Sequence, residues 1–216
     1  MGDPAIQQDE IDYSNPPFPL TSIDRGLLAM KDEDFHRITW DDLKQIIANN
    51  TLEDLKRVPS DLRRYLAWSH NIKQQYGSIT NFVIQQRLSW KPRSDDDPSQ
   101  FAHHSPIPFK DARDHVVLLN DWPYGFESGI VHLLVWTKTP IAVDDTRGDV
   151  TVESREVIVE FVQQFFVDEV EGGWEQVMWF KNWVSLQSVR GVDHVHVLVR
   201  DVPEGVLRGW LERRDL

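Results

Sequence analysis

Two histidines alternate with valines near the end of the chain, in the run from Val192 to Val199. Successive side chains of a strand point to opposite faces, so this alternation predicts a strand with His194 and His196 on one face and valines on the other. Neighbouring imidazoles on a rigid element suit general acid–base or nucleophilic chemistry. Histidines on an amphipathic strand are also often packing residues, and the pattern alone leaves both interpretations open.

Polar side chains at the ends of other predicted strands add to this pair. They lie in the turn Asn120–Gly125, in the segment His132–Lys138 and in the polar run Lys181–Ser188. If the strands are neighbours, these groups meet at one end of a sheet. They would offer bases, cations, amide and hydroxyl donors and an acid, which suits stabilising an oxyanion or a phosphate beside a base. A satisfied polar network at a sheet edge is the structural alternative.

The elements that must position these groups follow from apolar runs and caps. Four strands are predicted at His115–Leu119, Ile130–Trp136, Val177–Phe180 and Val192–Val199. An amphipathic helix over 152–167, capped by Thr151, separates the second strand from the third. The short first and last connections favour hairpins, so the prediction is an α+β fold with one antiparallel sheet of at least four strands and a packed helix.

A helical region is predicted before the sheet. Helix starts are expected at Thr39, Thr51, Pro59-Ser60 and Ser78, with Gly77 ending the longest helix, and a terminal helix is expected over 206–211. Residues 1–34 are rich in Pro, Asp and Gln and are predicted to form a flexible arm. The rest, 35–216, is predicted to be a single catalytic domain: a helical basic region (35–90), a loop (91–112) and an α+β core (113–216).

Charge is distributed unevenly along the chain. The formal net charge is −12, but the segment from Lys56 to Arg93 holds eight basic residues and one acid, a charge of +7 that leaves −19 for the remainder. Such a segment is either a binding surface for a polyanion or a solvated helical face. The candidates for polyanion contact are Arg57, Arg63, Arg64, Lys73, Arg87 and Arg93.

Several classes of protein are disfavoured by what the sequence lacks. There is no cysteine, hence no disulfide framework and no thiolate metal site, and His103-His104 alone is weak evidence for a metal. No apolar run approaches the length of a membrane span, and the first residues do not resemble a signal peptide. We therefore expect a cytoplasmic protein without metal, other cofactor or membrane partner, and the sequence leaves its oligomeric state open.

The C-terminal part, about 113–200, resembles the histidine-triad superfamily, which includes galactose-1-phosphate uridylyltransferases. The resemblance rests on Asn120–Tyr124, His132–Lys138, Asn182 with Gln187–Val189, and His194–His196. His196 matches the histidine that attacks an α-phosphate in that superfamily. The third alternating position holds Leu198, which is neither His nor Gln, and the match departs from the superfamily there.

Nearly the whole chain is similar to the fungal family named for N-acetylglucosamine-induced protein. The matching stretches are Leu55–Arg57, Ser60–Tyr65, Tyr76–Ser78, Arg87–Trp90, Asn120–Gly125, His132–Lys138, Trp179–Trp183 and His194–Val197. Part of that family is known as arginine-containing cyclodipeptide synthases. The resemblance implies an aminoacyltransferase that takes aminoacyl groups from arginyl-tRNA and a second aminoacyl-tRNA and closes a diketopiperazine.

Site roles are predicted on that basis. His196 would be the general base with His194 beside it, while Lys138, Asn182 and Ser188 would orient the ester or stabilise its oxyanion. Asp121 would hold the arginine side chain beside Trp122, and a covalent route through Ser188 or Ser185 stays open. The remaining expected substrate contacts are Tyr124, His132, Trp136, Lys181 and Trp183, and the basic side chains above would contact RNA. The alternatives are a histidine-triad-like nucleotidyl transferase or phosphohydrolase and a non-catalytic binding protein of sugar-induced signalling.

Overall fold

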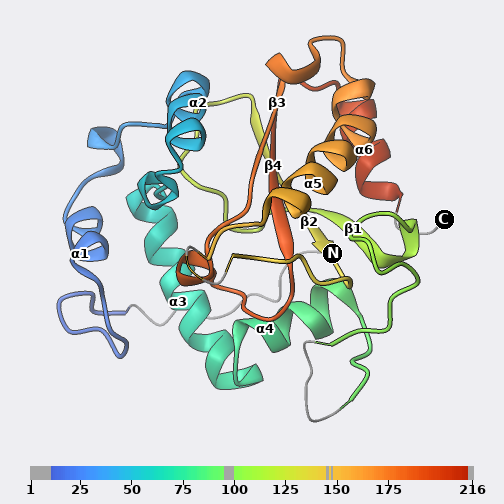
Figure 1. Cartoon of the computed structure of the whole chain (residues 1–216). Coiled ribbons are helices and arrows are strands. Elements are labelled where there is room, and N and C mark those ends of the chain that lie inside the picture. Colours follow the sequence, from blue (N-terminus) through green and yellow to red (C-terminus); the bar gives the residue numbers. More distant parts are fainter. Residues whose placement is uncertain (1–10, 95–99, 145, 147, 214–216) are drawn as a thin grey trace.

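The computed structural model describes residues 11–94, 100–144, 146 and 148–213. Its strands are β1 (His115–Leu119), β2 (Ile130–Thr137), β3 (Val177–Phe180) and β4 (His194–Arg200). Its α-helices are α1 (Ser22–Leu28), α2 (Trp40–Asn49), α3 (Pro59–Tyr76), α4 (Ile79–Phe82), α5 (Val152–Phe165) and α6 (Glu204–Glu212). The predicted α+β class is confirmed (Figure 1).

The four strands form one antiparallel sheet in the order β1-β2-β4-β3. All four predicted strands are present, and β4 begins at His194, two residues later than predicted. The central pair is β2 and β4, with Trp136 opposite His194 and Leu134 opposite His196. Both predicted hairpin neighbours, β1 with β2 and β3 with β4, are therefore paired.

One face of the sheet is covered by α5 and α6 (Figure 1). Val195, Val197 and Val199 of β4 are fully buried there, in the same cluster as Ile158 of α5 and Trp210 of α6. Helix α5 starts at the predicted cap, because Thr151 accepts a hydrogen bond from the Ser154 amide. It ends at Phe165, and a 3-10 turn, Val167–Glu169, follows.

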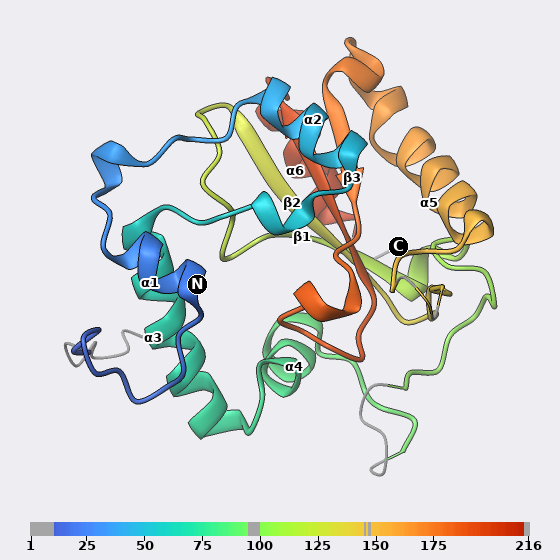
Figure 2. The ribbon, with the colours of Figure 1, turned by 60° about the vertical axis from the view of Figure 1, so that its left-hand side comes forward.

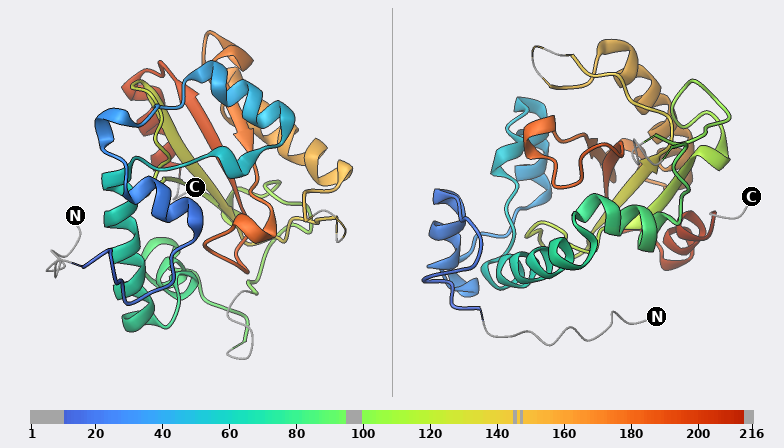
Figure 3. Two further views of the ribbon diagram at one scale, coloured as in Figure 1. Left: turned by 90° about the vertical axis from the view of Figure 1, so that its left-hand side faces the viewer. Right: turned by 90° about the horizontal axis from the view of Figure 1, so that it is seen from below.

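The opposite face is covered by the helical N-terminal region, in two separate clusters (Figures 2 and 3). Residues of α3 and α4 pack against β1 and β2, where Leu118 and Trp136 are buried. Helix α2 packs beyond them, where Trp40 and Leu43 share a cluster with Leu198 of β4. Because strand side chains alternate, the histidines of β4 lie on this second face, between the two clusters.

The N-terminal segment is partly ordered. The prediction of a flexible arm over 1–34 is wrong for Ser22–Leu28, which form α1, and its positions 1–10 lie outside the described residues. Thr21 and Asp24 form a capping box, and α1 packs against α3. The cap was overlooked because the surrounding Pro- and Asp-rich composition dominated the prediction.

The helices of the basic region start close to the predicted positions. Thr39 caps α2 in a capping box, whereas Thr51 precedes only a 3-10 turn and makes no side-chain cap. Ser78 caps α4, but the predicted helix continues as a π-helical stretch, Val83–Leu88.

Helix α3 begins at Pro59 and stops at Gly77, whose φ of +78° lies in the region that favours glycine. Pro59 suits the first helical turn because its missing N–H has no intrahelical partner there. None of the helices in the described ranges is both long and apolar enough to cross a membrane.

Candidate functional site

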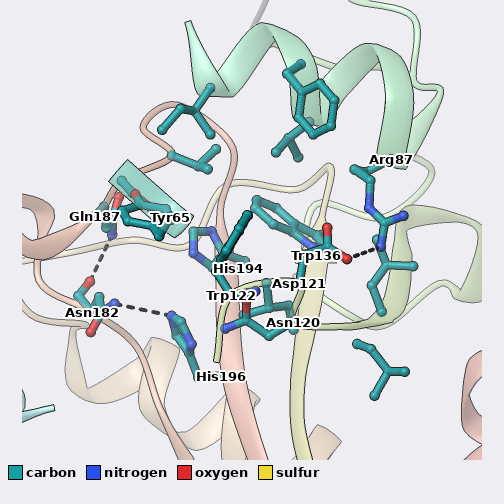
Figure 4. Close-up of a pocket in the computed structure, with 18 of the residues that line it drawn as sticks. Tyr65, Arg87, Asn120, Asp121, Trp122, Trp136, Asn182, Gln187, His194 and His196 are labelled. Atoms are coloured by element: carbon teal, nitrogen blue, oxygen red, sulfur yellow. Dashed lines mark hydrogen bonds and ion pairs between the residues drawn. The ribbon is translucent and has the colours of Figure 1, made fainter. Parts of the chain in front are cut away.

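A cavity of about 240 Å³ lies between the second face of the sheet, helices α3 and α4, and the segment after β3 (Figure 4). His194 and His196 of β4 and Trp136 of β2 line it from the sheet. Its size is slightly below the roughly 300–1,000 Å³ typical of sites for drug-sized ligands. We therefore expect it to hold a group of amino-acid size.

Aromatic rings form the wall opposite the sheet. The ring centroids of Trp68 and Trp122 are 5.2 Å apart, and Tyr65 lies 5.6 Å from Trp122 and 6.0 Å from Trp68. Tyr65 and Trp68 are three residues apart in α3 and so share one face of that helix. The wall offers flat apolar surface and the faces of several π-systems.

His196 is hydrogen-bonded to a histidine of the neighbouring strand. Nε2 of His132 lies 2.8 Å from Nδ1 of His196, and both side chains are buried. His132 is opposite Leu198 in the β2–β4 register, so it is the diagonal neighbour of His196 on the same face. Diagonal neighbours across a sheet are within reach of ring side chains. On its other side, His196 stacks on Phe180 of β3 at a centroid distance of 4.5 Å.

Two asparagines flank this histidine pair. Asn120 accepts from the Trp122 amide through Oδ1, which leaves its Nδ2 facing His132 at 3.2 Å from Nδ1. Nδ2 of Asn182 lies 3.3 Å from Nε2 of His196 and 3.2 Å from the Tyr124 hydroxyl. Oδ1 of Asn182 is buried and has no hydrogen-bond partner among the described residues.

Rotation of the Asn182 amide by half a turn would complete this network. Oδ1 would then accept from Nε2–H of His196 and from the Tyr124 hydroxyl. Asn120 would donate to Nδ1 of His132, and Nε2–H of His132 would donate to Nδ1 of His196. Each ring N–H and the Tyr124 hydroxyl would then meet an acceptor, and the Asn182 amide nitrogen would take the buried position that Oδ1 now occupies.

His194 has a defined tautomer. Its Nδ1 lies 3.0 Å from the carbonyl oxygen of Val192, which can only accept, so Nδ1 carries the proton. Nε2 therefore carries the lone pair and is the basic atom of this ring. The ring stacks on Trp136 at a centroid distance of 4.2 Å. His194 thus has the arrangement of a positioned base more clearly than His196, whose two nitrogens both have neighbours.

All three histidines are neutral at pH 7, chiefly because burial disfavours the charged imidazolium. Burial lowers the pKa of His194 to about 4, with a smaller effect in the same direction from the charge of Lys181. Burial lowers the pKa of His132 to about 3, helped by the charge of Arg57. The pKa of His196 lies well below its usual 6.5 for the same first reason, and His132 contributes next.

The charged residues that line the cavity are Arg57, Arg87 and Asp121. Arg87 forms a 2.7 Å ion pair with Asp121 at the mouth of the cavity (Figure 4). The Arg57 guanidinium lies 4.0 Å from the Tyr65 ring centroid, and its Nε donates to the Trp122 carbonyl. The cavity is therefore not acidic, and Asp121 is its only carboxylate among the described lining residues.

The structure brings most predicted site residues together but leaves four elsewhere. Asp121, Trp122, Tyr124, Trp136, Asn182 and Ser188 line the cavity with the two β4 histidines, and His132 lies behind His196. Lys138 and Lys181 line a second cavity instead. The Lys138 ammonium donates to the Arg113 carbonyl, and Lys181 forms a 3.0 Å ion pair with Asp193.

Trp183 and Ser185 are the other two exceptions. The Trp183 indole N–H donates to the side chain of Asn50, and Ser185 is exposed to solvent. The polar run after β3 turns through a 3-10 turn, Val184–Leu186, so its members do not all point the same way. Asn182, Gln187 and Ser188 face the first cavity, and Val184 faces the second.

The predicted RNA-contacting residues do not form one surface. Arg57 and Arg87 line the first cavity, and Arg63 donates to the Leu28 carbonyl of α1. Arg64 pairs with Asp61 on α3, while Lys73 is exposed on that helix. Arg93 lines the second cavity. The fold therefore divides this charged segment of the sequence among four environments.

A group of potential metal ligands lies apart from the cavity, at His104, Asp111 and Asp114. Asp114 is fully buried and accepts from the backbone amides of His104 and Ser105 and from the His104 ring. Asp111 is paired with Arg113. These contacts account for both carboxylates, which hold the loop 104–114 together by hydrogen bonds and an ion pair.

The predicted site roles left out Tyr65, Trp68, Asn120 and Gln187, which all line the cavity, and gave Arg57 a different role. Asn120 and Gln187 had been noted only as members of the polar turn and the polar run. The helical period of α3 placed the two aromatics on one face but favoured a core interpretation. The position of Asn120 at the end of β1, beside the predicted Asp121, was the available signal.

Comparisons with known proteins agree on one family. A family described as "Protein of unknown function (DUF3605)" matches residues 39–200. N-acetylglucosamine-induced protein 1 of Candida albicans is 32% identical in an alignment 184 residues long, and the alignment covers 77% of this chain and 69% of that protein. The uncharacterized protein YPL067C of Saccharomyces cerevisiae is 31% identical over 160 residues, 74% of this chain and 77% of that protein. A crystal structure of HTC1 superposes with a TM-score of 0.61 at 28% identity, covering 80% of this chain and 95% of the other.

Proposed function

The chain belongs to the DUF3605 family, together with N-acetylglucosamine-induced protein 1, and for this member we propose a tRNA-dependent synthase of arginine-containing cyclic dipeptides. One observation carries the proposal. Two neutral imidazoles of β4 and the Asn182 amide after β3 line an aromatic cavity of amino-acid size. An acyl transfer between amino acids needs this combination of a base, hydrogen-bond donors and restricted water.

His194 is the proposed general base. The attacking α-amine forms a bond to the ester carbonyl carbon, and the resulting ammonium gives its proton to Nε2 of His194. Burial keeps the His194 imidazole unprotonated at pH 7, so its Nε2 is free to accept this proton. The imidazolium then gives the proton to the ribose oxygen as the carbon–oxygen bond breaks. A second such transfer closes the ring, so two aminoacyl-tRNAs yield one cyclic dipeptide and two tRNAs.

Asn182 and Ser188 are proposed to stabilise the tetrahedral oxyanion. Both line the cavity beside the histidines, and the Asn182 amide is buried. Loss of one such donor typically costs roughly 10²–10³ in turnover.

Arginine recognition would depend on Asp121 and on the aromatic wall. The lining holds two arginines and one aspartate, so its net charge does not attract a cation. A guanidinium can instead stack on Trp122 as Arg57 stacks on Tyr65, and compete with Arg87 for the Asp121 carboxylate. Under this proposal, Asp121→Asn reduces arginine incorporation more than incorporation of the partner amino acid.

The test is product formation by wild type and by His194→Asn. Asparagine keeps an N–H where Nδ1 donates to the Val192 carbonyl but lacks the basic nitrogen. We expect arginine-containing cyclic dipeptides from purified wild type with arginyl-tRNA and a second aminoacyl-tRNA, detected by mass spectrometry. Turnover by His194→Asn should fall by roughly 10²-fold or more. His70→Asn on α3, outside the cavity, is the matched control and should retain activity.

Two results would reject the proposal. Folded wild type that yields no cyclic dipeptide with any second aminoacyl-tRNA rules out the activity. Full turnover by His194→Asn rules out His194 as the base, and His196→Ala then decides whether the neighbouring imidazole has that role.

A second candidate is a phosphotransferase or phosphohydrolase with His196 as nucleophile. It is favoured by the His132–His196 contact when Nδ1–H of His196 donates to Nε2 of His132, which is the tautomer opposite to that of the rotated Asn182 network. Nε2 of His196 then carries the lone pair and is the attacking atom. Incubation with nucleoside phosphates distinguishes the two. Release of phosphate or nucleoside monophosphate that is lost in His196→Ala but retained in His194→Asn would support the second candidate.

A further inference from the structure

We infer that the second cavity, of about 450 Å³, is a phosphate-binding site for the RNA that carries the aminoacyl ester, an inference that rests on the proposed function. Its lining includes the basic side chains Arg93, Lys138, Lys181 and Arg190, together with His103. The one acidic lining residue among those described is Asp193, which is already paired with Lys181. No residue of this cavity other than Gln187 lines the first one.

The charge of this cavity is opposite to that of the chain. The protein carries −12 overall, whereas four arginine and lysine side chains converge here against one carboxylate. Like charges repel one another when they are brought together, so such a cluster is most stable with an anion between its members. Arg93 and Arg190 are exposed, so a polyanion has access to them from solvent.

A single segment of chain separates the two cavities. Along 181–194, Asn182, Ser188 and His194 face the first cavity, whereas Lys181, Arg190 and Asp193 face the second. Gln187 lines both. A ligand that spans this segment has its phosphates in the second cavity and its other end beside the histidines of the first.

This arrangement fits an aminoacyl-tRNA better than a free nucleotide. An aminoacyl ester joins a reactive end that carries no phosphate to a chain of phosphates, and the two cavities differ in the same way. The aromatic cavity is of amino-acid size. The basic cavity is larger, and two of the arginines that line it are exposed to solvent. Phosphate contacts through Lys and Arg position an RNA without reading its sequence, as an enzyme acting on several tRNAs requires.

The experiment compares two double variants with the same change in charge. Arg93→Glu/Arg190→Glu alters the second cavity, and Arg25→Glu/Arg208→Glu alters exposed arginines of α1 and α6. The probe is labelled uncharged tRNA, titrated at several salt concentrations, with ATP as a separate ligand. We expect the cavity variant to bind tRNA at least about 10-fold more weakly and to lower the salt slope by roughly two, one for each lost phosphate contact. The control variant should bind like wild type.

The outcomes separate this inference from the proposed function. If wild type makes the cyclic dipeptide but the cavity variant keeps its tRNA affinity and its KM for aminoacyl-tRNA, the inference is wrong and the function stands. If wild type makes no product, and if the cavity variant loses tRNA binding while the control variant keeps it, the site stands and the function is wrong. Equal weakening in the control variant overturns the inference, and so does ATP binding as tight as that of tRNA.

Discussion

Acidification from pH 7 to pH 5 should destabilise this protein through its buried histidines. The pKa of His194 is about 4 and that of His132 about 3 in the folded protein, against 6.5 when unfolded. Between those values the unfolded chain binds more protons than the folded one, so stability falls as pH falls. The contribution of the neutral buried histidines to the free energy of unfolding is fully present above pH 6.5. It is lost progressively below that pH and stops changing only near the folded-state pKa values.

The magnitude follows from the distance between pH 5 and the unfolded-state pKa. That distance is about 1.5 units, and at ~1.36 kcal/mol per unit each neutral buried histidine costs about 2 kcal/mol at pH 5. His132 and His194 together therefore lower the free energy of unfolding by about 4 kcal/mol. His196 and His115 act in the same direction, since burial lowers the pKa of both. The carboxylates contribute little in this window, because their unfolded-state pKa values lie near 4.

Urea denaturation at pH 7 and at pH 5 measures this difference. His194→Asn serves as the comparison, because it removes one titrating group and should reduce the pH dependence by about 2 kcal/mol. An unfolding free energy that changes by less than about 1 kcal/mol between the two pH values would refute the reasoning. The expected loss of about 4 kcal/mol is a large part of the about 5–15 kcal/mol that a typical domain has in total. The imidazoles would then titrate in the folded protein close to their unfolded-state pKa of 6.5, and burial would not be what keeps them neutral.

Three substitutions test the packing around the site. Gly125→Ala places a Cβ 2.5 Å from a ring carbon of Phe35; it should cost about 1–3 kcal/mol in chemical denaturation, and an unchanged midpoint would show that Phe35 moves freely. Gly209→Ala, in α6 with open space around the new Cβ, should stabilise by roughly 0.5–1 kcal/mol, and a lower Tm would contradict this. Asp193→Asn leaves the buried Lys181 ammonium without its partner; it should cost about 3 kcal/mol or more, and retention of wild-type stability would mean that Lys181 reaches solvent.

Periodicity made much of the fold predictable. The alternation of His194, Val195, His196 and Val197 defined a strand and its two faces, and the structure buries the valines against α5 and α6 as expected. Capping residues located helix starts for the same local reason, as Thr39 does for α2. Such signals need only neighbouring residues, so they survive without knowledge of the rest of the chain.

Composition was a weaker guide. The segment from Lys56 to Arg93 has a charge of +7, yet its arginines are distributed among the first cavity, the second cavity, the contact with α1 and the exposed surface of α3. Helical rotation and ion pairing decide where each long side chain points. Arg57 illustrates this, because stacking on Tyr65 turns it inward.

The sequence by itself determined the strands, most helices and the histidine face, because each depends on a period that is read within a few residues. Only the tertiary structure decided which polar groups meet. The β2–β4 register places His132 against His196 across 64 positions of chain, and the Asp193 ion pair holds Lys181 in the second cavity. Register and ion pairing depend on the burial of the whole sheet between its two helical layers, which no local pattern encodes.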